Sequence, residues 1–233
     1  AHNAHPGTGE IVGRAIAEAV AANGLHPGVF SLVFGPGSSV GQQLVADSRI
    51  AAVGFTGSRS GGLALQSTAQ ARKVPIPVYA EMSSVNPVIL LDGALAGDGA
   101  RVVAEQFVTS LTGSSGQLCT APGIVLVPTG TAGDTFAEEV AELIGPQTGQ
   151  TMLTPSIAEA FDRGVAALAA QNDVSTVGAG SVGEGANAPA PIVFTATSAA
   201  LRDNEVLSDE IFGAASLLVR YDGIDDLLDT LTG

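Results

Sequence analysis

The sequence predicts an α/β protein with mostly parallel strands. Short apolar runs alternate with helical patterns along all 233 residues, as is typical of strands joined by right-handed helical crossovers. Two junctions between a predicted strand and the next helix are rich in glycine. In open parallel sheets ligands gather at such junctions.

Composition and charge narrow the class of protein. Hydrophobic residues make up 45% of the chain and charged residues 14%, which excludes a highly charged disordered chain and allows one or two domains with a core. The net charge of −14 argues against a nucleic-acid partner. One cysteine cannot form an internal disulfide, and no apolar run reaches the roughly 18–20 residues of a membrane span. We expect a cytoplasmic protein without a membrane partner.

The elements follow from periodicity and from capping residues. Thr8 can cap the first helix and Gly24 can end it. Helices are predicted at residues 8–23, 39–47, 61–73, 101–111, 135–144 and 156–171, and another begins at 223. Strands are predicted at residues 29–34, 50–55, 76–82, 87–91, 123–128, 191–197 and 215–221, and a loop at 177–191.

The glycine-rich junctions allow two interpretations. Gly35, Gly37 and Gly41 follow the first predicted strand, and the stretch "GFTGSRSGG" (54–62) follows the second. Glycine lets backbone N–H groups approach phosphate oxygens at a helix N-terminus, but it also serves ordinary turns. Neither junction matches G-x-G-x-x-G, so from the residues alone a nucleotide site and plain turns remain open.

Cys119, the only cysteine, lies in "GSSGQLCT" (113–120), among small and polar residues. A structural cysteine usually sits among apolar side chains, so this thiol is either reactive or simply exposed. His2 and His5 have metal-like spacing, but no cysteine or clustered carboxylate accompanies them or His26. We predict no metal site.

Four motifs occur in order: "FTGS" (55–58), "YAEMSSVNP" (79–87), "GQLC" (116–119) and "DEIFG" (209–213). This set resembles the aldehyde dehydrogenase superfamily. The opening "AHNAHPGT" (1–8) and "EMSSVNP" (81–87) resemble its NADP-dependent branch, which oxidises 2-oxoglutarate semialdehyde (2,5-dioxopentanoate) and some fatty aldehydes. Ser83 and Ser84 replace the usual glycine pair, and Ala214 replaces a common proline.

The resemblance implies an aldehyde-dehydrogenase-like fold covering about half of a family member. Residues 1–81 would be the C-terminal part of a Rossmann-type NAD(P)-binding domain, and residues 82–233 most of an α/β catalytic domain. The family's oxyanion asparagine and cofactor lysine would lie upstream and its oligomerisation segment downstream, so the complete protein is expected to be a homo-oligomer.

The resemblance also assigns chemistry to two residues. Cys119 would attack a small aldehyde, giving a thiohemiacetal and, after hydride transfer, a thioester; a thiolate is both nucleophile and leaving group. Its backbone N–H would be an oxyanion donor. Glu81 would be the general base, and desolvation at an apolar strand end would raise its pKa; the alternative is a solvated glutamate.

The cofactor expected from the resemblance is NADP, with NAD possible. Asn3 occupies a position where NAD-using relatives often carry a glutamate, and Arg59 could pair with a 2′-phosphate. The expected contacts are Thr56, Gly57 and Ser58 for the pyrophosphate, Gly37 and Gly41 on the adenine side, Glu210 for the nicotinamide ribose and Phe212 for the nicotinamide.

Three alternatives stay open. A long-chain fatty aldehyde is the alternative substrate. A cysteine hydrolase or acyltransferase would need a histidine beside Cys119, and no histidine follows His26. A non-catalytic nucleotide-binding fragment is the third.

Overall fold

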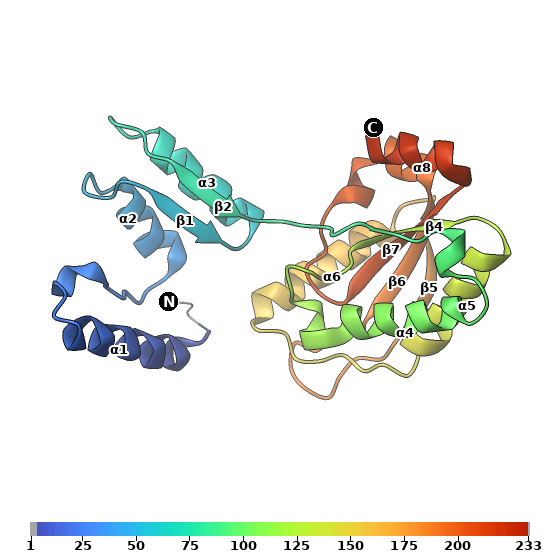
Figure 1. Ribbon diagram of the computed structural model, residues 1–233, viewed down its shortest axis with the longest axis horizontal. Coiled ribbons are helices and arrows are strands. Elements are labelled where there is room, and N and C mark those ends of the chain that lie inside the picture. The colour runs from blue at the N-terminus through green and yellow to red at the C-terminus, as the bar shows by residue number, and fades with distance from the viewer. Residues whose placement is uncertain (1–3, 233) are drawn as a thin grey trace. The chain divides into compact units, whose positions relative to one another are not determined.

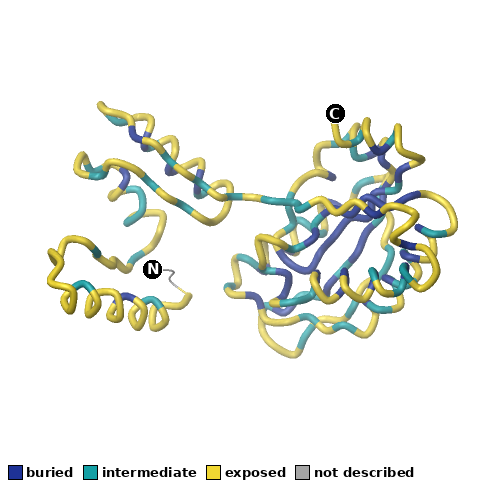
Figure 2. Tube along the Cα trace, viewed as in Figure 1, coloured by how far each residue is buried: buried dark blue, intermediate teal, exposed yellow. Residues whose placement is uncertain are grey.

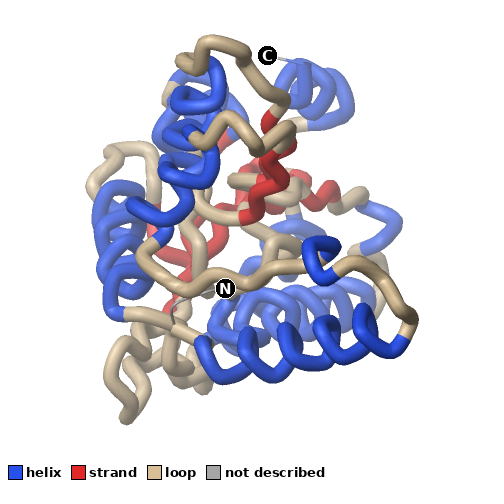
Figure 3. Tube along the Cα trace, turned by 90° about the vertical axis from the view of Figure 1, so that its left-hand side faces the viewer, coloured by secondary structure: helices blue, strands red, loops and turns tan. Residues whose placement is uncertain are grey.

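The computed structural model describes residues 4–232, and the chain divides into two compact units. The first unit ends at Ser83 and the second begins at Ser84. Figure 1 labels their elements, and Figure 3 colours them by type. The sequence predicted a boundary after residue 81, and the assignment of cofactor binding to the first unit stays a prediction.

The first unit contains a small parallel sheet. Its elements are α1 (Pro6–Ala22), α2 (Gln42–Ala46), β1 (Val53–Thr56), α3 (Arg59–Gln70) and β2 (Val78–Glu81). The strands β1 and β2 run parallel, and α3 is the crossover between them. A small core holds them together, with the buried residues Val45, Leu65, Ala69 and Ile76.

Two predictions in this unit were wrong. The apolar run 29–34 is not a strand, and the exposed side chains of Leu32 and Phe34 give the reason. Strand propensity acts mainly through packing of side chains against a core. Thr8 is not the cap of α1, because the helix begins at Pro6 and His5 is its N-cap residue. Proline is favoured at this first position because it needs no N–H partner there.

The second unit is a five-stranded sheet covered by helices on both faces. Its strands are β3 (Val88–Ile89), β4 (Ile124–Pro128), β5 (Ser175–Ala179), β6 (Ile192–Thr197) and β7 (Ala215–Tyr221), in the order β3-β4-β7-β6-β5. The helices are α4 (Gly99–Thr112), α5 (Thr131–Ile144), α6 (Pro155–Ala169), α7 (Ser198–Asp203) and α8 (Gly223–Thr232). Every pair of neighbouring strands is parallel except β5 with β6.

Strand β4 shows how the two faces are filled. All five of its residues are buried, because a central parallel strand is covered on both sides. Val125 and Val127 pack into the core formed with α4 and α5. Ile124 and Leu126 pack into the core on the other face, to which α6, α7 and α8 contribute. The buried strands form the dark blue centre of this unit in Figure 2.

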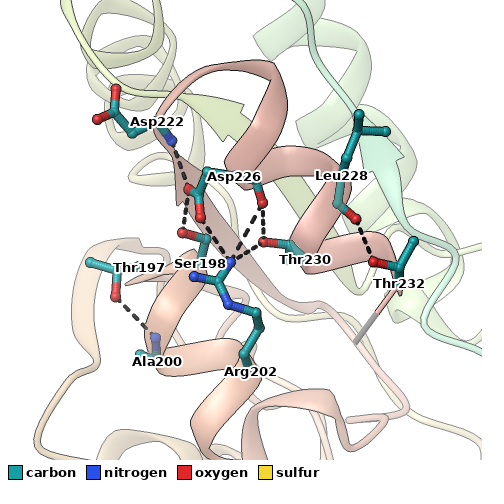
Figure 4. Close-up of polar contacts among 9 residues, drawn as sticks. All are labelled: Thr197, Ser198, Ala200, Arg202, Asp222, Asp226, Leu228, Thr230 and Thr232. Atoms are coloured by element: carbon teal, nitrogen blue, oxygen red, sulfur yellow. Dashed lines mark hydrogen bonds and ion pairs between the residues drawn. The ribbon is translucent and has the colours of Figure 1, made fainter.

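Polar contacts join the helix α8 to α7, and the carboxylate of Asp226 and the hydroxyl of Thr230 both take part (Figure 4). Asp226 accepts hydrogen bonds from Ser198 Oγ at 2.6 Å, from the Asp222 N–H at 2.8 Å and from Arg202 Nη1 at 2.8 Å. These donors, with Ser198 the largest contributor, lower the pKa of Asp226 to about 2. The ionised form of Asp226 therefore helps to hold α8 in place.

Three elements differ from the prediction. The strand β5 includes residues 177–179, which were expected to be loop. Its Gly178 lies against α5, where an added Cβ would come within 3.0 Å of the Ala141 Cα, so this glycine serves close packing. The helix α7 was not predicted, and the run 87–91 supplies only the two-residue strand β3. Among residues 4–232 no helix combines the length and apolar character needed to cross a bilayer.

Candidate active site

Cys119 lies in a tight turn and is exposed. The turn spans Leu118–Ala121 and is closed by a hydrogen bond of 3.0 Å from the Ala121 N–H to the Leu118 carbonyl oxygen. Cys119 is the second residue of this turn, a position from which its side chain can meet solvent. The exposure agrees with what its small and polar neighbours indicated.

The segment before the turn has an unusual backbone. Ser114, Ser115 and Gly116 have φ values of 53°, 60° and 66°, the left-handed region that non-glycine residues rarely adopt. Ser115 is buried, and its hydroxyl donates to the Gln150 carbonyl oxygen at 2.9 Å. Strained backbone of this kind persists only where surrounding contacts hold it, and it is common at functional sites.

Gly116 brings the "GQLC" motif against the "DEIFG" motif. A Cβ added to Gly116 would lie 2.3 Å from the Gly213 carbonyl carbon and 2.4 Å from the Ala214 nitrogen. Real Cβ atoms do not approach backbone atoms this closely, so the contact requires glycine. Gln117 then fastens the segment on another side, because its Oε1 accepts from the Leu153 N–H at 2.9 Å.

Asn86, from the "EMSSVNP" motif, contacts the turn directly. Its Nδ2 donates to the carbonyl oxygens of Cys119 at 2.7 Å and Ala121 at 3.0 Å. Its Oδ1 accepts from the Ser84 hydroxyl at 2.9 Å. No role for Ser84 or Asn86 was predicted from the sequence. The feature of the sequence that marks this position is an asparagine directly before a proline.

Glu210 joins the same region. Its Oε1 accepts from the backbone N–H of Ser84 at 3.3 Å. Glu210, Phe212, Ser84 and Leu118 line one small cavity of about 20 Å³, which is room for a single water molecule. The second unit therefore brings together "GQLC", "DEIFG" and residues 84–87 of the motif "YAEMSSVNP".

The fourth motif, "FTGS", lies in the first unit, where β1 ends and α3 begins. Thr56 and Glu81 are register partners at the ends of β1 and β2, and both are exposed. The Gly57 N–H donates to the Glu81 carbonyl oxygen at 3.1 Å. Ser58 caps α3, since its Oγ accepts from the Gly61 N–H at 3.2 Å. The loop thus presents a helix N-terminus, which favours an anion.

The space around a side chain would differ between Gly57 and Gly37. A Cβ on Gly57 would come within 2.7 Å of the Phe55 ring, so a side chain there would require that ring to shift. Gly37 opens a five-residue π-helical turn, Gly37–Gly41, and a Cβ on it would meet nothing within 4 Å. Gly41 would only make an ordinary contact with Leu65. Gly37 therefore leaves open space on its surface.

Glu81 is not buried, contrary to the prediction from the sequence. We predicted a carboxylate desolvated at an apolar strand end, but Glu81 is exposed within its unit. The reason is its position, because the side chains of Thr56 and Glu81 alternate away from the small core below the sheet.

The structure gives less information about the remaining residues that were predicted for the site. Asn3 and His2 lie outside the described residues. Arg59 is the exposed first residue of α3. The Nδ1 of His26 accepts from the Gly28 N–H at 3.0 Å and so caps a turn. Within the described part of the chain, no group of three His, Cys, Asp or Glu residues could hold a metal ion.

A sheet with crossover helices and an exposed thiol in a turn held by hydrogen bonds define an α/β protein with an accessible thiol. Comparison with known proteins identifies its family. The pattern of the aldehyde dehydrogenase family matches residues 6–231, and the chain belongs to this family. Alpha-ketoglutaric semialdehyde dehydrogenase 2 of Azospirillum brasilense is 45% identical over 231 residues, which are 99% of this chain and 44% of that protein. The alpha-ketoglutaric semialdehyde dehydrogenase of Acinetobacter baylyi is 37% identical over 232 residues, with the same coverage.

Solved structures confirm the predicted fold. Proline utilization A from Bradyrhizobium japonicum has a TM-score of 0.76 and 28% identity, covering 94% of this chain and 22% of that one. A 1-pyrroline-5-carboxylate dehydrogenase from Thermus has a TM-score of 0.75 and 24% identity, covering 95% and 44%. The chain spans less than half the length of these relatives.

Proposed function

We propose that the protein oxidises 2-oxoglutarate semialdehyde to 2-oxoglutarate with NADP, through a thioester on Cys119. The observation that carries this proposal is the convergence of three motifs around the Cys119 turn: Asn86 holds the turn, and Glu210 and Phe212 line the cavity beside it. The identity of 45% to a protein named alpha-ketoglutaric semialdehyde dehydrogenase supports the substrate. It also favours this semialdehyde over a long-chain fatty aldehyde.

The first step uses the exposed thiol of Cys119. Its sulfur would attack the aldehyde carbon, forming a C–S bond and moving the carbonyl electron pair to oxygen. The backbone N–H of Cys119 is the proposed donor to this oxyanion. A cysteine with the ordinary pKa near 8.5 is only a few per cent thiolate at neutral pH. The exposed position of Cys119 lets its thiol reach a substrate as well as solvent.

A bound NADP would supply the hydride acceptor, so that the carbon attached to the Cys119 sulfur could lose its hydride and become the carbonyl carbon of a thioester. The described residues fit such a group. The N-terminus of α3 behind Gly57 and Ser58 suits a pyrophosphate, and the open surface at Gly37 suits the adenine side of the cofactor. We propose that Glu210 binds the nicotinamide ribose and that Phe212, 39% exposed, packs on the nicotinamide.

The second half-reaction needs water and a base. Water would attack the thioester carbon while Glu81 accepts its proton, and the Cys119 thiolate would leave to give the carboxylate. Glu81 stands exposed at the end of β2. We further propose a cytoplasmic, homo-oligomeric complete protein.

One experiment tests these assignments together. In the complete protein, Cys119→Ala should lower kcat for 2-oxoglutarate semialdehyde at least 10³-fold, because the substitution removes the thiol that would form the thioester. Thr120→Ala, at the next exposed position of the same turn, is the matched control and should retain activity. Wild-type protein should have a higher kcat/KM with NADP than with NAD. Full activity in Cys119→Ala would refute the nucleophile, and an NAD preference would refute the cofactor.

A further inference from the structure

The carbonyl oxygens of the Cys119 turn are held by a side chain from a segment 33 residues earlier in the sequence. The two amide hydrogens of Asn86 Nδ2 go to the Cys119 and Ala121 oxygens, at 2.7 and 3.0 Å. Both acceptors belong to the turn that presents the thiol. Asn86 therefore binds the turn at two points, and one of them is the nucleophile's own peptide group.

The two carbonyl oxygens of the turn set the orientation of this amide, because they can only accept and the nitrogen of Asn86 must face them. The amide oxygen then faces Ser84, whose hydroxyl donates to Asn86 Oδ1 at 2.9 Å. In the opposite orientation Oδ1 would face two carbonyl oxygens, none of which can donate. The Ser84 hydroxyl thus holds the amide from the side opposite the turn, in the orientation that binds the turn.

The bond to the Cys119 oxygen acts on the part of the turn that can rotate. Type I and type II turns differ in the orientation of the central peptide group, which here joins Cys119 to Thr120. In the type II form the third residue needs positive φ. The third residue of this turn is Thr120. Among the described non-glycine residues, positive φ occurs at Asn86, Ser114, Ser115 and Asn187. Thr120 is not one of them, so the central peptide has the type I orientation. Asn86 holds the central peptide in that form.

The backbone of Asn86 carries independent support. Its φ is 42° although it precedes Pro87, and a residue before proline is normally extended. A strained conformation of this kind is retained where the surrounding structure requires it. At Asn86 the strained backbone carries the amide that reaches both carbonyl oxygens.

We propose that Ser84 and Asn86 form a positioning pair for the nucleophile. Asn86 fixes the Cys119–Thr120 peptide and so limits movement of the turn that carries the Cys119 thiol, while Ser84 holds the amide of Asn86 from the other side. Neither residue takes part in bond making. The proposal rests on the proposed function only in calling Cys119 the nucleophile.

Hydrogen exchange tests whether Ser84 and Asn86 stabilise the turn, without any assay of activity. The Ala121 amide closes the turn, so its exchange reports opening of the turn. Asn86→Ala removes both side-chain hydrogen bonds to the turn and should speed that exchange about 30-fold, and Ser84→Ala about fivefold, on ordinary hydrogen-bond strengths. Ser84→Thr keeps a hydroxyl and should behave like wild type. Asn187→Ala is the matched control, since Asn187 also has a left-handed backbone, with φ of 57°, in another loop.

Two further readouts separate positioning from general destabilisation. In the Asn86→Ala background Ser84→Ala should have no additional effect, because its partner is gone. In the complete protein Asn86→Ala should slow the first burst of reduced cofactor at least tenfold and leave the Kd for NADP unchanged. Unchanged Ala121 exchange in Asn86→Ala, an equal change in Asn187→Ala, or additive effects of the two substitutions would overturn the pair. Activity in Cys119→Ala would instead overturn the proposed function, and the exchange result would stand.

Discussion

The substitution Gly116→Ala tests whether the "GQLC" glycine is needed for packing. A Cβ at this position would lie 2.3 Å from the Gly213 carbonyl carbon and 2.5 Å from its oxygen. Both are backbone atoms, which cannot rotate away as the end of a flexible side chain can. The backbone of Gly116 also has a φ of 66°, where alanine is strained. We therefore expect loss of stability by two separate causes.

The magnitude follows from those causes. Placing alanine in left-handed backbone costs about 1 kcal/mol relative to glycine. Inserting a methyl group into a filled site with forced backbone movement costs a further ~1–3 kcal/mol. The sum of about 2–4 kcal/mol corresponds to a decrease in Tm of roughly 5–15 °C for a unit of this size.

Urea unfolding and thermal unfolding both measure this loss. Gly113→Ala is the matched control, since Gly113 lies in the same segment with a φ of −56°, and a Cβ on it would meet nothing within 4 Å. We expect Gly113→Ala to unfold within about 0.5 kcal/mol of wild type. If Gly116→Ala were as stable as Gly113→Ala, the close contact between the two motifs would not exist in solution.

Two further predictions concern carboxylates. In Glu81→Gln steady turnover should fall about 10²–10⁴-fold, while one equivalent of reduced cofactor still forms and mass spectrometry finds an acyl group on Cys119; an undiminished steady rate without acyl-enzyme would make Glu81 an ordinary exposed acid. Asp226 has a folded pKa of about 2, below its unfolded value of 3.8, so its stabilisation is present above about pH 4 and is lost as the pH falls through 2. Asp226→Asn should therefore unfold at lower urea than wild type at pH 6, with the difference disappearing near pH 2, and an equal difference at both pH values would contradict this account.

Local chemistry determined much of this protein from its sequence. The helices α5 and α6 and the strands β4, β6 and β7 lie within a few residues of their predicted positions, because periodicity and turn residues act over short distances. The exposed Cys119 was expected from its neighbours for the same reason. The four motifs led to the family that the comparisons show over residues 6–231.

Long-range contacts decided the rest, and no local pattern contains them. The run 29–34 was apolar enough for a strand, yet the exposure of Phe34 shows that its packing is not that of a core strand. The glycine-containing strand β5 is in the sheet because β6 pairs with it and α5 lies against Gly178. Asn86 reaches the Cys119 turn across 33 residues of sequence, and only the paths of β3 and β4 bring them together. A sequence states which residues can form a hydrogen bond or a strand, and the tertiary structure decides which partners they meet.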